Sequence, residues 1–155
     1  MFQLMLEPLR KYAVFKGRAS RAEFWQFIAF SVVFPKLAAT LSHAVDSVGA
    51  FAQWTQFLLM LALASPSIAV TVRRLHDRDK SGWWALLLHG TLWAMVVGSV
   101  LVSAFSEPGF LAAFAMMLGF AIVIWMSVVL ARRGTRGPNR YGDDPVASPV
   151  AETFA

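Results

Sequence analysis

The sequence of 155 residues contains no cysteine, which excludes disulfide bonds and thiolate metal sites. Charge is also scarce, since charged residues make up 15% of the chain against about 25% in a typical soluble domain. Hydrophobic residues make up 57% of the chain, and the mean hydropathy is +0.57. This balance favours an integral membrane protein over a soluble domain.

Four long stretches of the chain are almost free of charge, and each has about the 20 residues that a helix needs to cross a bilayer. They cover residues 24–41, 51–72, 83–105 and 110–131. The sequence therefore predicts an all-α fold, an integral membrane bundle of four transmembrane helices. Pro66 lies in the second span between two serines, where we expect it to kink the helix while the serine hydroxyls satisfy the freed backbone groups.

The first residues precede these spans and have a mixed pattern. Pro8 suits the first turn of a short helix, on which Leu9 and Tyr12 would share an apolar face. We expect an amphipathic helix on the membrane surface, with a frayed terminus as the alternative. Residues 1–145 are thus predicted to form a single membrane domain, followed by a disordered tail at 146–155.

Basic residues are missing from two of the loops between the spans, 42–50 and 106–109. The other three polar segments hold Arg10, Lys11, Lys16, Arg18, Arg21, Arg73, Arg74, Arg78, Lys80, Arg132, Arg133, Arg136 and Arg140. An even number of spans puts all three on one side, which the positive-inside rule makes the cytoplasm. We therefore predict a multi-pass membrane protein with both termini cytoplasmic.

Local spacing predicts several caps and pairs at the ends of the spans. Ser20 and Glu23 have the spacing of a capping box, in which each side chain accepts from the other residue's amide. Ser81 is placed as the N-cap of the third span. Arg73 and Asp77 are four residues apart at a helix end, so we expect them to pair.

Three polar motifs flank the spans: residues 15–25 (FKGRASRAEFW), Arg73–Asp77 followed by Ser81–Trp84, and residues 137–145 (GPNRYGDDP). Together with the spans they resemble a family of small bacterial inner-membrane proteins catalogued as domain of unknown function 805 (DUF805). The resemblance implies a four-helix integral protein of the bacterial inner membrane and brings no assigned reaction. Where Arg78 stands, the family usually has a small or hydrophobic residue.

If the four helices form one bundle, the three motifs converge at its cytoplasmic end. The candidate cluster consists of Arg18, Arg21, Glu23, Arg73, Arg74, His76, Asp77, Trp83, Trp84, Asn139, Arg140 and Tyr141. Arginine forks bind phosphate in a bidentate manner, and Asn and Tyr add donors, so the cluster suits an anionic lipid headgroup or an acidic partner. The alternative is a structural clamp, or basic residues that only determine topology.

Other function classes find little support in the sequence. His76 and Asp77 lack a nucleophile in a recognisable motif, and the histidines lack metal-ligand spacing, so we predict a non-enzymatic protein without a cofactor. A small transporter or channel component acting as an oligomer is the alternative, with Lys36 and His89 as its only titratable groups inside the spans. For His89 we expect instead a hydrogen bond to a neighbouring helix.

The charge balance also bears on the partners. The formal net charge is +5 and the sequence pI is about 10.2, but the basic residues stand beside apolar runs and not on a soluble face. We therefore expect anionic lipid headgroups as partners and no nucleic acid. A second copy of the chain or another membrane protein is a further partner to consider.

Two pairs of small residues, Ala94 with Gly98 and Ala115 with Gly119, have the spacing that lets helices approach closely.

Overall fold

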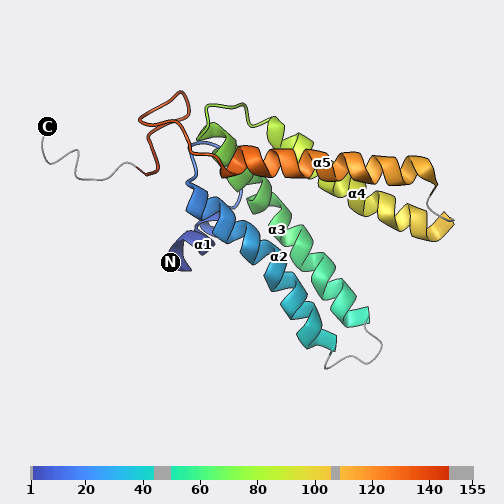
Figure 1. Cartoon of the computed structure of the whole chain (residues 1–155). Coiled ribbons are helices and arrows are strands. Elements are labelled where there is room, and N and C mark those ends of the chain that lie inside the picture. The colour runs from blue at the N-terminus through green and yellow to red at the C-terminus, as the bar shows by residue number, and fades with distance from the viewer. Residues whose placement is uncertain (1, 44–49, 106–108, 147–155) are drawn as a thin grey trace, which may run out of the picture.

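The structure is a computed structural model that describes residues 2–43, 50–105 and 109–146. Within these ranges the chain is helical, with one isolated bridge between Asn139 and Gly142 in place of any strand. The helices are α1 (Phe2–Arg10), α2 (Arg21–His43), α3 (Ala50–His76), α4 (Trp84–Phe105) and α5 (Phe110–Ala131), as Figure 1 shows. The predicted all-α fold is confirmed. The predicted 106–109 turn and disordered tail fall largely outside the described residues.

Four of the helices, α2 to α5, are long and apolar enough to cross a membrane, which confirms the four predicted spans. Their ends differ from the predicted limits. The helix α3 continues beyond Val72 to His76, so Arg73 and Arg74 belong to its last turn. Cations are favoured there because the carbonyl end of a helix carries partial negative charge.

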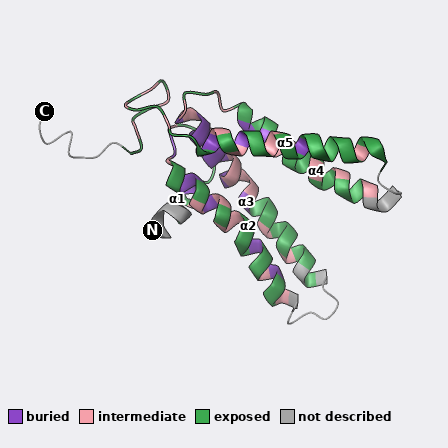
Figure 2. Cartoon of the chain, viewed as in Figure 1, coloured by how far each residue is buried: buried purple, intermediate pink, exposed green. Residues whose placement is uncertain are grey.

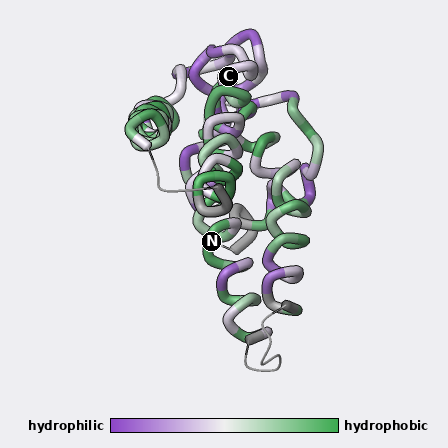
Figure 3. The backbone as a smooth tube through the Cα atoms, turned by 90° about the vertical axis from the view of Figure 1, so that its right-hand side faces the viewer, coloured by the Kyte–Doolittle hydropathy of each residue, from purple (hydrophilic) through white to green (hydrophobic). Residues whose placement is uncertain are grey.

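The four spans are arranged as two helical hairpins. In Figure 1, α2 and α3 run side by side, α4 and α5 run side by side, and the two pairs diverge from the end that carries the C-terminal loop. Figure 3 gives the side view, in which hydrophilic residues gather in that loop. We call this end, where the three basic segments lie, the basic end.

Buried side chains gather at the basic end, whereas the far ends of both hairpins are exposed (Figure 2). At the far ends, large apolar groups such as Trp54 and Phe110 are 64% and 83% exposed, as expected for helices that lipid surrounds. The core combines residues of α2, α3, α4 and α5 with Ala19, and includes Phe24, Phe27, Val70, Leu75, Ala85, Leu88, Met126 and Leu130. Burial therefore holds the two hairpins together at one end.

The helix α1 forms in the predicted N-terminal segment and is amphipathic, but Pro8 and Tyr12 are placed differently from the prediction. It ends at Arg10, two residues after Pro8, so the proposal that Pro8 opens the helix was wrong. Pro8 is fully buried, and Leu9 packs against the core. This packing outweighs the one intrahelical hydrogen bond that the proline removes. Tyr12, which was predicted to share the apolar face of this helix with Leu9, lies beyond its end.

Tyr12 instead supplies the donor that Pro66 removes from α3. Because proline has no N–H, the carbonyl of Ala62, four residues earlier, loses its partner within the helix. The Tyr12 hydroxyl donates to that oxygen at 2.6 Å, and the Ser65 hydroxyl donates to the Tyr12 carbonyl at 3.2 Å. Ser67 donates to a different carbonyl of α3. The predicted repair by the serines was therefore wrong, since an aromatic residue 50 positions away makes it.

We expect Tyr12→Phe to lower the free energy of unfolding by about 1–3 kcal/mol, because it leaves a carbonyl unsatisfied beside the apolar part of the chain. Tyr141→Phe is the matched control, since the Tyr141 hydroxyl makes no hydrogen bond in the part of the chain that the structure describes. Thermal unfolding of both variants in detergent gives the comparison. Equal melting temperatures for the wild type and Tyr12→Phe would contradict this role.

Candidate functional site

Three segments that are far apart in the sequence meet at the basic end. The turn before α2 contacts α3 through a hydrogen bond from the Ala19 amide to the Arg73 carbonyl at 3.1 Å. The loop after α5 contacts the end of α3 through a bond from the Thr135 amide to the Asp77 carbonyl at 2.8 Å. These backbone contacts place the candidate charged side chains of all three segments within reach of one another.

Asp77 is the centre of the buried charge at the basic end. Its Oδ1 accepts from Arg18 Nε at 3.0 Å and from Nη2 at 2.8 Å, and its Oδ2 accepts from Arg74 Nη1. The Arg18 and Asp77 side chains are only 1% and 5% exposed. Arg18 also donates to the carbonyls of Gly137 and Thr135, each at 2.6 Å. We call Arg18, Arg74 and Asp77 the clamp, because they tie all three segments together.

Arg74 joins the clamp to the end of α5. Its Nε donates to the Leu130 carbonyl at 2.9 Å, and its Nη2 donates to the Arg132 carbonyl. The last carbonyls of a helix have no partner within the helix, so this guanidinium satisfies groups that would otherwise be buried and unpaired. The first hairpin thereby holds the second by its final turn.

Arg78 contacts the same turn of α5, by donating from Nη1 to the Val129 carbonyl at 2.5 Å. Burial lowers the pKa of Arg78 from its ordinary value, and the nearby Arg132 lowers it further. Arg78 therefore serves as a second donor to the end of α5.

A second buried ion pair joins α2 to α3. Arg73 Nη1 lies 2.6 Å from Glu23 Oε1, with side chains 1% and 8% exposed. The Ser20 hydroxyl accepts from the Glu23 amide at 3.1 Å, so that half of the capping box forms. The other half was predicted wrongly, because the Glu23 carboxylate pairs with Arg73. The predicted pair of Arg73 with Asp77 was wrong too, since Asp77 lies beyond α3 and accepts from Arg18 and Arg74 instead.

The C-terminal loop covers the end of α3 through ring contacts. The rings of His76 and Tyr141 stack with centroids 3.8 Å apart and 4° between their planes, and Arg140 lies 4.8 Å from the Tyr141 ring centre. Asn139 Nδ2 donates to the His76 carbonyl at 2.9 Å. His76 Nδ1 lies 3.2 Å from the Gly17 carbonyl oxygen, and it donates to that oxygen whenever Nδ1 carries a proton. These four candidate residues thus hold the loop against α3.

The two tryptophans of the candidate cluster lie at the start of α4, outside the clamp. Trp83 is 78% exposed. Trp84 packs edge-on against Trp125 of α5, with the ring centroids 5.8 Å apart. Ser81 caps the turn that leads into α4, in line with its predicted role at the start of this span. Its hydroxyl accepts from the Trp83 amide at 3.4 Å, and its carbonyl accepts from the Trp84 amide at 3.3 Å.

A pocket of about 250 Å³ opens at the basic end, beside the clamp. We call it the basic pocket; its lining consists of Arg21, Arg74, Asp77, Arg133, Gly134, Thr135, Arg136, Asp144 and Val146. The side chains of Arg21, Arg133 and Arg136 form no ion pair or hydrogen bond within the described ranges. Arg133 and Arg136 were not among the candidate site residues, because nothing in their spacing indicates that this loop turns back toward α2.

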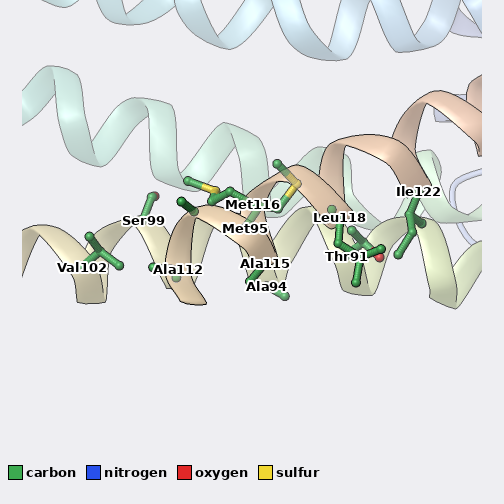
Figure 4. A pocket seen from close by; sticks show the side chains of 13 residues that line it. Thr91, Ala94, Met95, Ser99, Val102, Ala112, Ala115, Met116, Leu118 and Ile122 are labelled. Atoms are coloured by element: carbon green, nitrogen blue, oxygen red, sulfur yellow. The ribbon is translucent and has the colours of Figure 1, made fainter. Parts of the chain in front are cut away.

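A larger, apolar groove of about 940 Å³ lies along α4 and α5 (Figure 4). Both predicted pairs of small residues line it, Ala94 with Gly98 and Ala115 with Gly119. Only Gly119 is in close packing, since a Cβ there would lie 2.9 Å from the sulfur of Met95, whereas a Cβ at Gly98 would meet open space. The groove carries no charged side chain and is separate from the basic pocket.

The fold and the basic end define a class, namely multi-pass helical membrane proteins whose spans are joined at one end by buried arginine–carboxylate pairs. The chain belongs to the family described as "Protein of unknown function (DUF805)", which matches residues 12–143. The resemblance drawn from the three motifs is thereby confirmed.

Named relatives cover nearly the whole chain. Inner membrane protein YhaI of Escherichia coli K12 is 30% identical over 143 residues, 92% of this chain and 95% of the relative. Inner membrane protein YhaH of the same strain is 33% identical over 146 residues, 93% and 97% of the two chains. Uncharacterized protein YiiR is 33% identical over 134 residues, 84% of each. No solved structure matches the chain significantly. The relatives and the four apolar helices support a multi-pass protein of the inner membrane.

Proposed function

We propose that this protein is a non-enzymatic inner-membrane protein whose basic pocket binds the phosphate of an anionic lipid headgroup. The observation that carries the proposal is the set of three unpaired guanidinium groups, from Arg21, Arg133 and Arg136, on one pocket. Guanidinium groups bind phosphate oxygens through paired, charge-assisted hydrogen bonds. A pocket of about 250 Å³ admits such a group.

The position of the pocket along the spans favours a lipid ligand over a soluble one. Arg21 is the first residue of α2, and Arg133 follows the end of α5 by two residues. The pocket therefore lies where two spans begin or end, which is the level of the headgroups when the apolar helices fill the hydrocarbon layer. Basic residues at this level attract anionic lipid on the cytoplasmic side.

The clamp itself is assigned a structural role. Each guanidinium nitrogen of Arg18 and Arg74 donates to Asp77 or to a backbone carbonyl. These donors are therefore not free to hold a ligand. The clamp positions the C-terminal loop, and the loop in turn supplies Arg133 and Arg136 to the basic pocket.

The alternative of a small transporter or channel component gains no specific support. Lys36 is exposed on α2, and His89 Nδ1 contacts the Ala85 carbonyl of its own helix at 3.0 Å. The expected hydrogen bond from His89 to a neighbouring helix was therefore wrong. Among the described residues no ion pair involves Lys36 or His89.

The proposal places the basic end in the cytoplasm, which labelling tests directly. The chain has no native cysteine, so single cysteines report without background. A cysteine at Ser81 is expected to react with an impermeant maleimide only after the cells are permeabilised. Cysteines at Ser47 and Ser106, which lie outside the described residues, are expected to react in intact cells. Reaction at Ser81 in intact cells would overturn the orientation.

Lipid retention tests the binding site. We expect Arg133→Gln to weaken retention of phosphatidylglycerol by about tenfold, because one bidentate charge-assisted contact is lost. Native mass spectrometry of the purified full chain in neutral detergent measures retention. Arg132→Gln is the matched control, since it removes the same charge from the adjacent residue, whose side chain does not line the basic pocket. An equal loss in both variants would show that only net charge matters and would refute the pocket.

A further inference from the structure

The basic pocket has more positive charge than one lipid phosphodiester can neutralise. Its lining includes four arginines and two aspartates, which leaves an excess of two positive charges. A phosphodiester headgroup such as phosphatidylglycerol brings one negative charge and two terminal oxygens. A phosphate monoester brings up to two negative charges and three strong acceptor oxygens near neutral pH.

The two carboxylates on the pocket are already bound by other groups and leave Arg21, Arg133 and Arg136 unpaired among the described residues. Asp77 gives both oxygens to the clamp. Asp144 accepts from the Val146 amide at 3.0 Å and from the Gly137 amide at 3.1 Å. These amide bonds, together with the charge of Arg18, hold the pKa of Asp144 below its usual range. Neither carboxylate forms an ion pair with Arg21, Arg133 or Arg136 in the described part of the chain.

We infer that the basic pocket selects a phosphate monoester over a phosphodiester, because three unpaired guanidinium groups match three terminal oxygens and a double charge. This inference rests on the anion site proposed above and names its ligand class. The monoester can be carried by a membrane lipid, as in phosphatidic acid, or can be free in solution, as in inorganic phosphate. The chemistry recognised is the same in both, and the experiment separates the two sources.

The test titrates the full-length protein in neutral detergent with phosphatidic acid, phosphatidylglycerol and phosphatidylcholine of identical acyl chains. Native mass spectrometry at pH 7.5 gives the bound fraction of each lipid. Phosphatidic acid is expected to bind at least about fivefold more tightly than phosphatidylglycerol, since one more unit charge near a guanidinium gains about that much even at the dielectric constant of water. In Arg136→Gln this preference is expected to fall, while Arg132→Gln keeps it.

The same titration at pH 5 supplies an internal control on the ligand. The dianion of a phosphate monoester takes up a proton near pH 6 and becomes a monoanion, so its advantage over the diester is expected to disappear at pH 5. Guanidinium groups keep their charge at both pH values, and the lowered pKa of Asp144 keeps its carboxylate ionised. His76 does not line the pocket. The charged groups that face the ligand are Arg21, Arg74, Arg133, Arg136, Asp77 and Asp144.

The outcomes separate this inference from the proposed function. If both anionic lipids bind equally and more tightly than phosphatidylcholine, the anion site stands and the monoester preference is refuted. If neither exceeds phosphatidylcholine, both proposals are refuted. Where phosphatidic acid is preferred, competition by inorganic phosphate supports recognition of the free group, and failure to compete supports recognition of the lipid.

Discussion

Asp77→Asn is expected to lower the free energy of unfolding by roughly 3–5 kcal/mol, which is the usual cost of removing one partner from a buried ion pair. Both oxygens of Asp77 accept from arginines, and its side chain is 5% exposed. Asparagine keeps the shape but has no charge and only one acceptor oxygen. The guanidinium groups of Arg18 and Arg74 would therefore stay buried without a counter-charge.

A matched control for this variant lies two residues further along the chain. Asp79 pairs with Arg140 at 2.9 Å, but the two side chains are 48% and 59% exposed. Exposed pairs contribute about 1 kcal/mol or less, so Asp79→Asn is expected to have little effect. Its φ of 55° is also one that asparagine tolerates. Thermal unfolding in detergent compares the two, and equal losses would contradict the central role of Asp77.

Gly134→Ala is the second variant from which we expect a large loss, about 2–4 kcal/mol, because overpacking would here also displace a buried carboxylate. A Cβ at Gly134 would overlap the Asp77 carboxylate, lying 2.7 Å from Oδ1 and nearer still to Oδ2. Asp77 cannot move away without breaking its hydrogen bonds to Arg18 and Arg74. The added methyl group must therefore move the loop or break the clamp.

Gly98→Ala serves as the control for this second variant. It makes the same chemical change inside α4, where a Cβ would meet open space, so it is expected to be neutral or slightly stabilising. Melting temperatures and lipid retention of both variants provide the readout. If Gly134→Ala melted with the wild type, the loop would have to lie farther from Asp77 than the structure places it.

The transmembrane architecture could be predicted from the sequence because long charge-free runs have few other stable forms. The ends of the spans were less accessible. A block such as Arg73–Asp77 suggests a water-facing turn, yet α3 includes Arg73 and Arg74, both only 1% exposed. Arg74 can be buried because Asp77 and backbone carbonyls of other segments accept from all its nitrogens. Glu23 supplies the counter-charge for Arg73, whose Nε and Nη2 are buried without a hydrogen bond among the described residues. Such partners do not show in the local sequence.

The site was predictable as a region but not as a set of contacts. The motifs indicated that their charges share one side of the membrane, and Arg18, Arg74 and Asp77 do meet there. The pairing was mistaken because the local rule joined Arg73 to Asp77, whereas Arg18, 59 residues away, holds that carboxylate. The basic pocket depends further on how the loop after α5 folds back, which no pattern in residues 132–146 reveals.

The clamp has a consequence for the timing of synthesis. Arg18 donates to Thr135, 117 positions later, and Arg74 donates to Arg132, 58 positions later. A ribosome therefore completes the first hairpin well before it makes the carbonyls that these arginines require. Until residues 130–137 have been translated, the nascent chain holds guanidinium groups near the membrane without their final acceptors. Assembly of the basic end can finish only when residues 130–137 have left the ribosome, since domains generally fold in the order of their synthesis.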